Sequence, residues 1–526
     1  MAKEKPKVAR SREQWSGQMG FIFAAIGSAV GLGNIWRFPG VAYENGGGAF
    51  IIPYLIALLT AGIPILFLDY AIGHRYRGAP PTAFRRIRKW AEGFGWFQVA
   101  ICLVIILYYA VIIAWAGSYA VFSLDLKWGD DSSAFFFNDY LQKPDGDPGF
   151  GLDFVPWILW ALIGVWVITL VILAFGVQKG VEKANIVFLP LLVILFVALV
   201  LRSLFLPGAL DGLNAFFTPN WGALLDPGVW LAAYAQIFFS LSIAFGIMIT
   251  YSSYLKKKSN LTGPGLVVGF ANSSFEMLAG IGVFSTLGFM AQQQNVGVNE
   301  LENIAGVALS FVTFPHIVST MPGGAVFGLL FFGSLFLAGL TSLLSLLQVV
   351  SGAFQDKFNI SPRQAALRVG GAAAIVSVFL FARTDGLMTL DTMDKWANEV
   401  GIVASAIVML VLMLSLRMLP TVRRHLNASS SFQLGKGWQF LVGILAPLVL
   451  LTMFISGVVK VITEPYNDNP HWFNNVFGWG AIGFMVLFAI MMSKVRWRID
   501  VDNFTPEPAL PGEIIDAKAL STSGKD

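Results

Sequence analysis

Two glycines that flank a leucine, Gly31 and Gly33, interrupt the first long apolar stretch of the chain, and Asn34 and Arg37 follow at once. Inside hydrocarbon, each backbone N–H or C=O group freed by such a break costs several kcal/mol unless it lines a cavity or binds a ligand. The N-terminal end of a half-helix attracts an anion, and freed carbonyl oxygens attract a cation. The sequence therefore predicts a site for a polar or charged molecule at this break.

A second polar interruption, residues 239–246, lies in the sixth apolar segment, five helices after the first. Two broken helices in corresponding positions of two five-helix halves indicate an inverted-repeat transporter. The alternative is that small residues serve close helix packing. Asn34 and Arg37 beside the first break, and Ser240 and Ser242 at the second, favour a binding site.

Ionisable side chains inside apolar segments are expensive, so each is a functional candidate. The candidates are Arg37, Glu276, Asp394 and Glu399. Arg37 lies beyond the first break toward the outside, and Asp394 lies near the outer end of the tenth segment, so the two can meet as a gate above the site. The alternative is a charge that reaches the membrane edge, and for Glu399 the sequence does not decide between the two.

Glu276 lies one helical turn after Asn272, which places both side chains on one face of the seventh segment. A carboxylate buried there can carry a proton that exchanges during transport. The alternative is a structural glutamate held by hydrogen bonds.

The eighth segment carries a line of polar side chains, Thr341, Ser342, Ser345 and Gln348. Hydroxyl and carbonyl oxygens are hard ligands of the kind that sodium prefers. Hydroxyl groups that bond their own helix are the alternative, and only the other candidate residues favour the ion site.

The elements that position these residues follow from composition. The chain has 526 residues, of which 56% are hydrophobic and 13% charged, and its mean hydropathy is +0.69. It is too apolar for a soluble globule and too long for one membrane anchor. We predict an all-α integral membrane protein with about twelve spans. The expected spans are 16–43, 49–73, 95–124, 154–175, 181–205, 229–254, 263–291, 325–354, 365–382, 387–416, 437–462 and 473–493.

Basic residues fall in alternate loops, which the positive-inside rule assigns to the cytoplasm. They cluster within 3–12, 75–89, 179–183, 256–258, 423–424 and 496–498, whereas the 125–153 loop of the opposite set is acidic. We therefore expect a multi-pass protein of the cell (inner or plasma) membrane, in contact with the lipid bilayer, with both termini in the cytoplasm. The net charge of +4 reflects this topology and not nucleic-acid binding.

The expected organisation has six parts: a cytoplasmic tail (1–14), a first five-helix repeat (15–205), an extracellular loop (206–228), a second, inverted five-helix repeat (229–419), helices 11 and 12 (434–495) and a cytoplasmic tail (496–526). No signal peptide is indicated. Cys102, the single cysteine, is expected to be a buried apolar residue. The proline-rich tail after Arg498 is expected to be flexible.

The run GSAVGLGNIWRFP at 27–39, followed by ENGGGAF at 44–50, strongly resembles the neurotransmitter:sodium symporter family, especially its bacterial amino-acid transporters with the LeuT-like fold. Further family features follow in order: Tyr108-Tyr109, QIFFSLS at 236–242, AGLTS at 338–342 and LDTMD at 390–394. The resemblance covers the first ten spans and is weak over the last two.

The resemblance implies a substrate carboxylate bound by the N–H groups of Leu32 and Gly33, by the Tyr109 hydroxyl and by a sodium ion. The substrate ammonium group would meet carbonyl groups of Ala29, Phe239 and Ser240 and the hydroxyl of Ser242. Further pocket residues would be Ile105, Ala244, Phe245, Ser342 and Leu346.

The resemblance also implies two sodium sites. The first would use Ala29, Asn34, Ser240 and Asn272, and the second Gly27, Val30, Ala338, Thr341 and Ser342. Gly180 and Pro190 match a family spacing associated with local unwinding that opens a cytoplasmic route to the second ion.

The same resemblance implies two gates. The outer gate would pair Arg37 with Asp394 under the aromatic lid of Phe239 and Tyr109. The inner gate would pair Arg12 with Asp356, supported by Trp15 and Tyr254.

In chloride-dependent relatives the anion sits among residues that match Tyr54, Gln236, Ser240 and Asn272, and Glu276 here replaces a chloride-associated serine. The resemblance therefore implies transport without a chloride requirement, with proton counter-transport by Glu276.

Ala244, Ile105 and Leu346 narrow the pocket, which favours a small neutral amino acid such as glycine or alanine. Larger hydrophobic amino acids are the alternative, because backbone shifts in the sixth span accommodate bigger side chains in relatives. One methyl group is worth only about 1 kcal/mol of discrimination.

Three other functional classes were weighed. A membrane enzyme needs a catalytic cluster, yet all four histidines fall in loops or at helix ends and Cys102 has no partner, so no enzyme is expected. An ion channel does not need paired gates, and an amino-acid sensor on the same fold stays open. The sequence leaves the oligomeric state undetermined.

Overall fold

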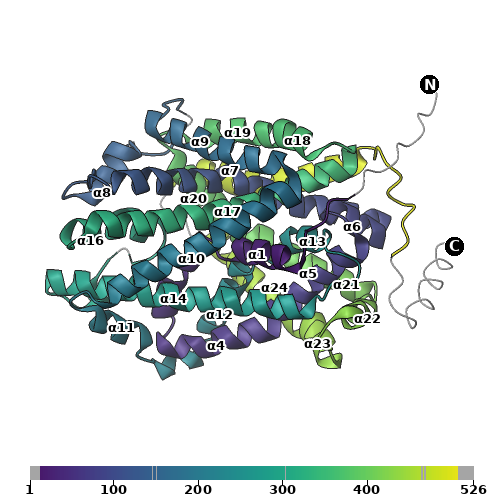
Figure 1. Cartoon of the computed structure of the whole chain (residues 1–526), viewed down its shortest axis with the longest axis horizontal. Coiled ribbons are helices and arrows are strands. Elements are labelled where there is room, and N and C mark those ends of the chain that lie inside the picture. The colour runs from purple at the N-terminus through teal and green to yellow at the C-terminus, as the bar shows by residue number, and fades with distance from the viewer. Residues whose placement is uncertain are drawn as a thin grey trace.

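The computed structural model describes residues 12–144, 146–149, 151–302, 304–463, 466 and 469–506. Within these residues the chain is an elongated bundle of helices (Figure 1), and extended pairing is limited to the isolated bridges Gly47–Pro219 and Phe154–Arg383. The expected all-α membrane architecture is confirmed.

Ten helices of the described chain are long and apolar enough to cross a membrane, and the number is eleven if the bent pair at the first break counts as one span. The ten spans are Gly48–Tyr76, Lys89–Phe122, Pro156–Ala174, Val177–Leu204, Thr262–Gln294, Gly324–Phe358, Pro362–Phe381, Gly386–Ser415, Lys436–Thr463 and His471–Lys494. The sixth expected span consists of two shorter helices, so the count of twelve stays a prediction.

Regular helices make up most of each span. They are α4 (Ile51–Ala57), α5 (Ile63–Tyr76), α7 (Glu92–Phe122), α9 (Pro156–Ala174), α10 (Lys183–Leu204), α14 (Thr262–Gln294), α17 (Gly324–Phe358), α18 (Pro362–Ala365), α19 (Gly371–Phe381), α20 (Gly386–Trp396), α21 (Val403–Ser415), α23 (Lys436–Phe440), α24 (Ala446–Thr463), α25 (His471–Phe473) and α26 (Gly480–Lys494). Shorter helices connect them: α6 (Pro80–Ile87), α8 (Ser132–Ala134), α11 (Ala209–Phe217), α15 (Gly306–Ala308), α16 (Phe314–Thr320) and α22 (Leu419–Ser429).

The first helix is broken where the sequence predicts. Helix α1 (Gln18–Ala29) ends before Val30, whose backbone is extended, and α2 (Leu32–Trp36) and α3 (Phe38–Glu44) continue at an angle of 52°. Gly33 faces the Phe239 ring so closely that a Cβ atom would collide with it. Glycine is therefore required here for the two broken helices to approach each other.

The second break separates α12 (Pro227–Ser240) from α13 (Ile247–Ser252). Ser242, Ala244 and Gly246 take positive φ angles of 52°, 66° and 100°, which end the helical ladder. The left-handed region is unfavourable for residues with a side chain, and such strain concentrates at functional sites. The second predicted interruption is therefore present, and its backbone is held under strain.

Helices α7 and α17 pack along each other through the middle of the bundle and support the broken helices. Helices α6, α13 and α22 lie at one end of the bundle (right in Figure 1), which we call the terminal end. Arg12 pairs with Asp356 of α17, and Asp502 pairs with Arg85 of α6. The opposite end carries α8, α11 and α16.

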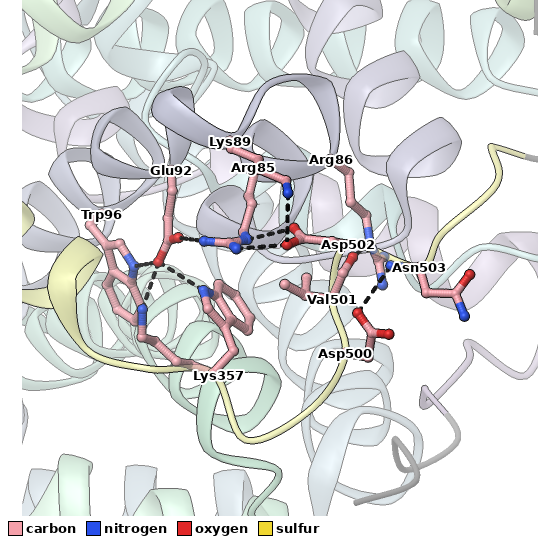
Figure 2. A network of polar contacts seen from close by, with 11 residues as sticks. Arg85, Arg86, Lys89, Glu92, Trp96, Lys357, Asp500, Val501, Asp502 and Asn503 are labelled. Atoms are coloured by element: carbon pink, nitrogen blue, oxygen red, sulfur yellow. Dashed lines mark hydrogen bonds and ion pairs between the residues drawn. The ribbon is translucent and has the colours of Figure 1, made fainter. Parts of the chain in front are cut away.

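The C-terminal tail differs in part from expectation. The tail after Arg498 was expected to be flexible, but residues 499–506 follow a defined path and Asp502 forms an ion pair with Arg85 (Figure 2). A single sequence contains no signal for this pairing, because the two residues are far apart along the chain. Residues 1–11 and 507–526 of the two expected tails lie outside the described part, and the six-part division stays a prediction.

Candidate substrate and ion site

The two helix breaks face each other across a cavity of about 70 Å³. The predicted pocket residues that line it are Ala29, Leu32, Gly33, Ile105, Tyr109, Phe239, Ser240, Ser242, Phe245, Ser342 and Leu346. The cavity is also lined by Tyr108, Ile247, Asn398 and Ile402. The sequence analysis gave Tyr108 only as part of a family motif and did not single out the other three. Ala244 does not line the cavity; it is fully buried behind it.

One end of the cavity presents the start of α2. The Leu32 N–H donates to the Tyr109 hydroxyl at 3.4 Å, a long contact for a hydrogen bond. The first N–H groups of a helix lack partners within the helix and attract negative charge. This end of the cavity therefore suits a carboxylate.

A chain of side-chain amides links the two breaks. The Gly31 N–H donates to Asn34 Oδ1 at 2.8 Å, and Asn34 Nδ2 donates to Asn272 Oδ1 at 2.8 Å. Asn272 Nδ2 then donates to Ser240 Oγ at 3.0 Å. Three of the four residues predicted for the first sodium site thus lie in one hydrogen-bonded chain, which presents oxygen atoms of the kind that sodium prefers.

Residues predicted for the second sodium site also lie together. Thr341 Oγ1 donates to the carbonyl oxygen of Ala338 at 3.0 Å, and Ser342 Oγ donates to the Ser28 carbonyl at 3.3 Å. A hydroxyl oxygen that donates its proton keeps lone pairs for a cation. A Cβ atom on Gly27 would approach Thr341, so the two helices meet here. This group of hydroxyl and carbonyl oxygen atoms is chemically suited to bind sodium.

Asn185 is a neighbour of this group that sequence reasoning missed. Its Nδ2 donates to the Val181 carbonyl at 2.8 Å, while its buried Oδ1 faces Gly27 and has no hydrogen-bond partner among the described residues. It lies between Gly180, in a π-helical turn (Val177–Glu182), and Pro190, inside α10. The irregular turn occurs where the glycine–proline spacing predicts weakness.

The strained segment of the second break is held by three side chains that sequence reasoning also missed. The Ala244 N–H donates to Asp69 Oδ2 at 2.8 Å, and its carbonyl accepts from Ser405 Oγ at 2.6 Å and Gln98 Nε2 at 2.9 Å. All three side chains are buried. They satisfy the freed backbone where water is absent, and thus fix the wall of the cavity.

Glu276 lies beside this site, where the sequence predicts it. Gln236 Nε2 donates to Glu276 Oε1 at 2.6 Å, and the Tyr54 hydroxyl contacts both Glu276 and, at 2.8 Å, Ser273 Oγ. The carboxyl group is fully buried, and no ion-pair partner lies within 4.0 Å among the described residues. A buried carboxyl group without a cation at contact distance is a suitable carrier for a proton.

The inner gate residues are assembled. Arg12 Nη1 pairs with Asp356 Oδ1 at 2.7 Å, and the Arg12 guanidinium lies 4.6 Å from the centre of the Tyr254 ring. Trp15 is buried and donates from Nε1 to the Tyr251 carbonyl at 2.8 Å. These contacts join the start of the described chain to α13 and to the end of α17.

The outer gate residues are not paired in the described structure. The Arg37 guanidinium lies 4.6 Å over the Phe239 ring, and Arg37 and Asp394 make no ion pair within 4.0 Å in the described residues. Asp394 borders the substrate cavity, while Arg37 borders an outer cavity of about 240 Å³. Phe239 lines both cavities. Glu399 borders the outer cavity and pairs with Lys395.

Two helices that are broken inside the membrane, and whose breaks line one cavity, are typical of a membrane transporter. A model of the sodium:neurotransmitter symporter family matches residues 12–140 and 130–499. The chain belongs to this family, and its relatives are sodium-dependent transporters.

Individual relatives support this family assignment. The chain is 39% identical to an uncharacterized sodium-dependent transporter of Methanocaldococcus jannaschii, over 92% of this chain and 98% of the relative. It is 31% identical to the sodium- and chloride-dependent GABA transporter 2 of Homo sapiens, over 74% and 70% of the two chains. It is also similar to the crystal structure of MhsT in complex with L-phenylalanine, with a TM-score of 0.71, 32% identity, and coverage of 85% and 100%.

Replacing Asp69 tests the support of the second break. We expect Asp69→Leu to weaken ligand binding in the cavity about 5- to 150-fold, because an unpaired buried N–H costs about 1–3 kcal/mol. Asp69→Asn keeps a side-chain oxygen for Ala244 and should lose less. Equilibrium binding of a radiolabelled amino acid to the purified protein in sodium chloride measures both. Equal affinity of the leucine variant and the unchanged protein would refute this role.

Proposed function

We propose that the protein is a sodium-coupled symporter that carries a small neutral amino acid, such as glycine or alanine, into the cell by alternating access. The observation that carries this proposal is the cavity between the two breaks, with N–H groups at one side and oxygen atoms at the other. A zwitterion has the matching pair of charges. In this account the terminal end faces the cytoplasm.

The size of the cavity supports a small substrate. The cavity of about 70 Å³ is smaller than the engineered cavity of about 150 Å³ that binds benzene in another protein. Glycine and alanine therefore suit it better than phenylalanine, whose side chain alone contains a benzene-sized ring. The second candidate is a larger hydrophobic amino acid, and it is favoured by the bound L-phenylalanine named for the MhsT structure.

We assign sodium to two sites. The first consists of Ala29, Asn34, Ser240 and Asn272, and the second of Gly27, Val30, Ala338, Thr341 and Ser342. Sodium would supply positive charge beside the substrate carboxylate, and this makes substrate affinity depend on the ion. Arg12 and Asp356 would separate when the site opens toward the cytoplasm, and Arg37 and Asp394 would approach when it closes toward the outside.

We further propose that transport needs no chloride and that Glu276 returns a proton. The human relative is named as chloride-dependent, whereas here a carboxyl group lies between Tyr54 and Gln236. A fixed negative charge makes an added anion unnecessary, and a protonated carboxyl group resets the charge for the return step.

Uptake into proteoliposomes tests the coupling. We expect labelled glycine or alanine to accumulate when an inward sodium gradient is imposed and to fall to background when potassium replaces sodium. Imposing chloride and pH gradients separately tests the other two ions. Accumulation that is unchanged in potassium would overturn the proposal, whereas saturable binding without uptake would indicate a sensor.

The Glu276→Ser substitution tests the chloride assignment. The variant removes the fixed charge, so we expect sodium-driven uptake at least about tenfold below the unchanged protein without chloride, a loss of ~1.4 kcal/mol, and partial recovery when chloride is added. Uptake measured in gluconate and in chloride provides the comparison. A variant whose uptake ignores chloride would count against this role of Glu276.

The Leu346→Ala substitution tests the substrate size. Leu346 lines the cavity, and each buried methylene is worth about 0.8 kcal/mol. We therefore expect the ratio of phenylalanine to alanine affinity to rise at least about tenfold. Competition against a labelled substrate measures the ratio. Leu347→Ala, at a buried neighbour that does not line the cavity, is the matched control, and equal ratios in the two variants would contradict the assignment.

A further inference from the structure

A groove of about 290 Å³ lies between α7 and α9, which run side by side at the edge of the bundle (Figure 1). On the α7 side its lining falls within residues 114–122, and α17 adds Phe336. On the α9 side the lining residues recur every three or four positions, so they share one face of that helix. These residues are Trp157, Trp160, Ala161, Gly164, Val165 and Ile168.

The groove has the depth of one membrane leaflet. From Trp157 to Ile168 the helix rises about 16 Å at about 1.5 Å per residue, and half of a hydrocarbon core of about 30 Å is about 15 Å. Trp157 and Trp160, where α9 begins, are 58% and 69% exposed, and tryptophan is enriched at the membrane–water interface. The groove therefore begins at the interface and extends inward alongside the acyl chains of one leaflet.

The space in the groove is not used for close helix packing. Glycine in a membrane helix commonly lets a neighbouring helix approach, yet a Cβ atom added to Gly164 would meet no atom within 4 Å. A Cβ atom on Gly117 would come within 3.2 Å of the Phe336 ring, so the open space lies on the α9 side. Water is absent at this depth of a membrane, and the space is therefore available to hydrocarbon.

A cation lies at the interface end of the groove. Lys127 Nζ is 4.7 Å from the centre of the Phe122 ring and 4.4 Å from that of the Trp157 ring, and both rings line the groove. Lys127 is exposed and forms no ion pair within 4.0 Å with another residue of the described chain. Cation–π contacts favour this position of the ammonium group, and a lysine there attracts a phosphate group.

We propose that this groove binds one phospholipid, with an acyl chain between α7 and α9 and the phosphate group at Lys127. A phospholipid has both parts that the groove has partners for: a hydrocarbon chain as long as one leaflet is deep, and a phosphate group at the interface. The lipid fills the space beside α7 and α17, which also supply Tyr109 and Ser342 to the substrate cavity. It therefore supports two helices that form the wall of that cavity.

Photolabelling in detergent tests the site, because no bulk bilayer is present to label every membrane-facing helix. The reagent is a phosphatidylethanolamine with a diazirine on one acyl chain, added to the purified, lipid-depleted protein. Mass spectrometry identifies the labelled peptides. A diazirine diacylglycerol, which has the same chains without the phosphate, and a diazirine fatty acid are the comparison reagents.

Two variants change the groove, and each has a matched control. Gly164→Phe places a ring in the open space, and its control is Gly371→Phe on α19, where an added Cβ atom also meets nothing within 4 Å. Lys127→Gln removes the cation. Its control is Lys143→Gln, at an exposed lysine whose Nζ lies 5.8 Å from the centre of the Phe137 ring, away from the groove.

We expect the phospholipid to label peptides within 114–122 and 157–168 of the unchanged protein and of both controls. Each buried methylene is worth about 0.8 kcal/mol, so Gly164→Phe should lower this labelling at least about tenfold. An exposed charge contact is worth about 0.2–1 kcal/mol, so Lys127→Gln should lower it up to about fivefold. Labelling by the diacylglycerol should be weaker and should not respond to Lys127→Gln.

Equal labelling of α7 and α9 in Gly164→Phe and Gly371→Phe would overturn the site, as would labelling spread evenly over the membrane-facing helices. Diacylglycerol or fatty acid that labels as strongly as the phospholipid would refute the phosphate contact at Lys127. Thermal unfolding of each variant checks the fold, and if Gly164→Phe does not fold, Lys127→Gln with the two phosphate-free reagents decides alone. No substrate or ion gradient enters the experiment, so its result is independent of the proposed transport.

Discussion

The structure depends on one constraint: every backbone polar group freed inside the membrane must find a partner. At the first break the Gly31 N–H is bound by Asn34, and at the second the Ala244 N–H and carbonyl are bound by Asp69, Gln98 and Ser405. The freed groups that remain face the cavity. Four buried side chains thus stabilise the two breaks inside the membrane, and in the proposed function a ligand with both charges would complete the site.

The same partners connect the two breaks, so neither can move alone. Asn34, Asn272 and Ser240 form a continuous hydrogen-bonded chain, and Ser242 and Ser342 both donate to the Ser28 carbonyl. In the proposed mechanism, an ion bound among these oxygen atoms would shift the first helix relative to α14 and α17. This geometry gives a physical route from ion binding to substrate affinity and to the gates.

Both breaks could be predicted from the sequence, because glycines and serines interrupt apolar segments locally. The pairing of Arg12 with Asp356 could be predicted only from the resemblance to a known family. The supporting side chains could not. Asp69 and Ala244 are far apart in the sequence, and an aspartate in an apolar helix gives no indication of which backbone group it will bind. The position of Arg37 over the Phe239 ring depends on conformation, and the ion pair of Asp502 with Arg85 is a contact between distant segments. Local sequence patterns predict neither of these two contacts.

The most direct test of the central claim is a density map of the protein with sodium and alanine bound. The account predicts an amino acid between the two breaks, with its carboxylate at the N–H groups of Leu32 and Gly33, and ion density among Asn34, Asn272 and Ser240. Density for the amino acid at any other place, with an empty cavity between continuous first and sixth helices, would contradict it.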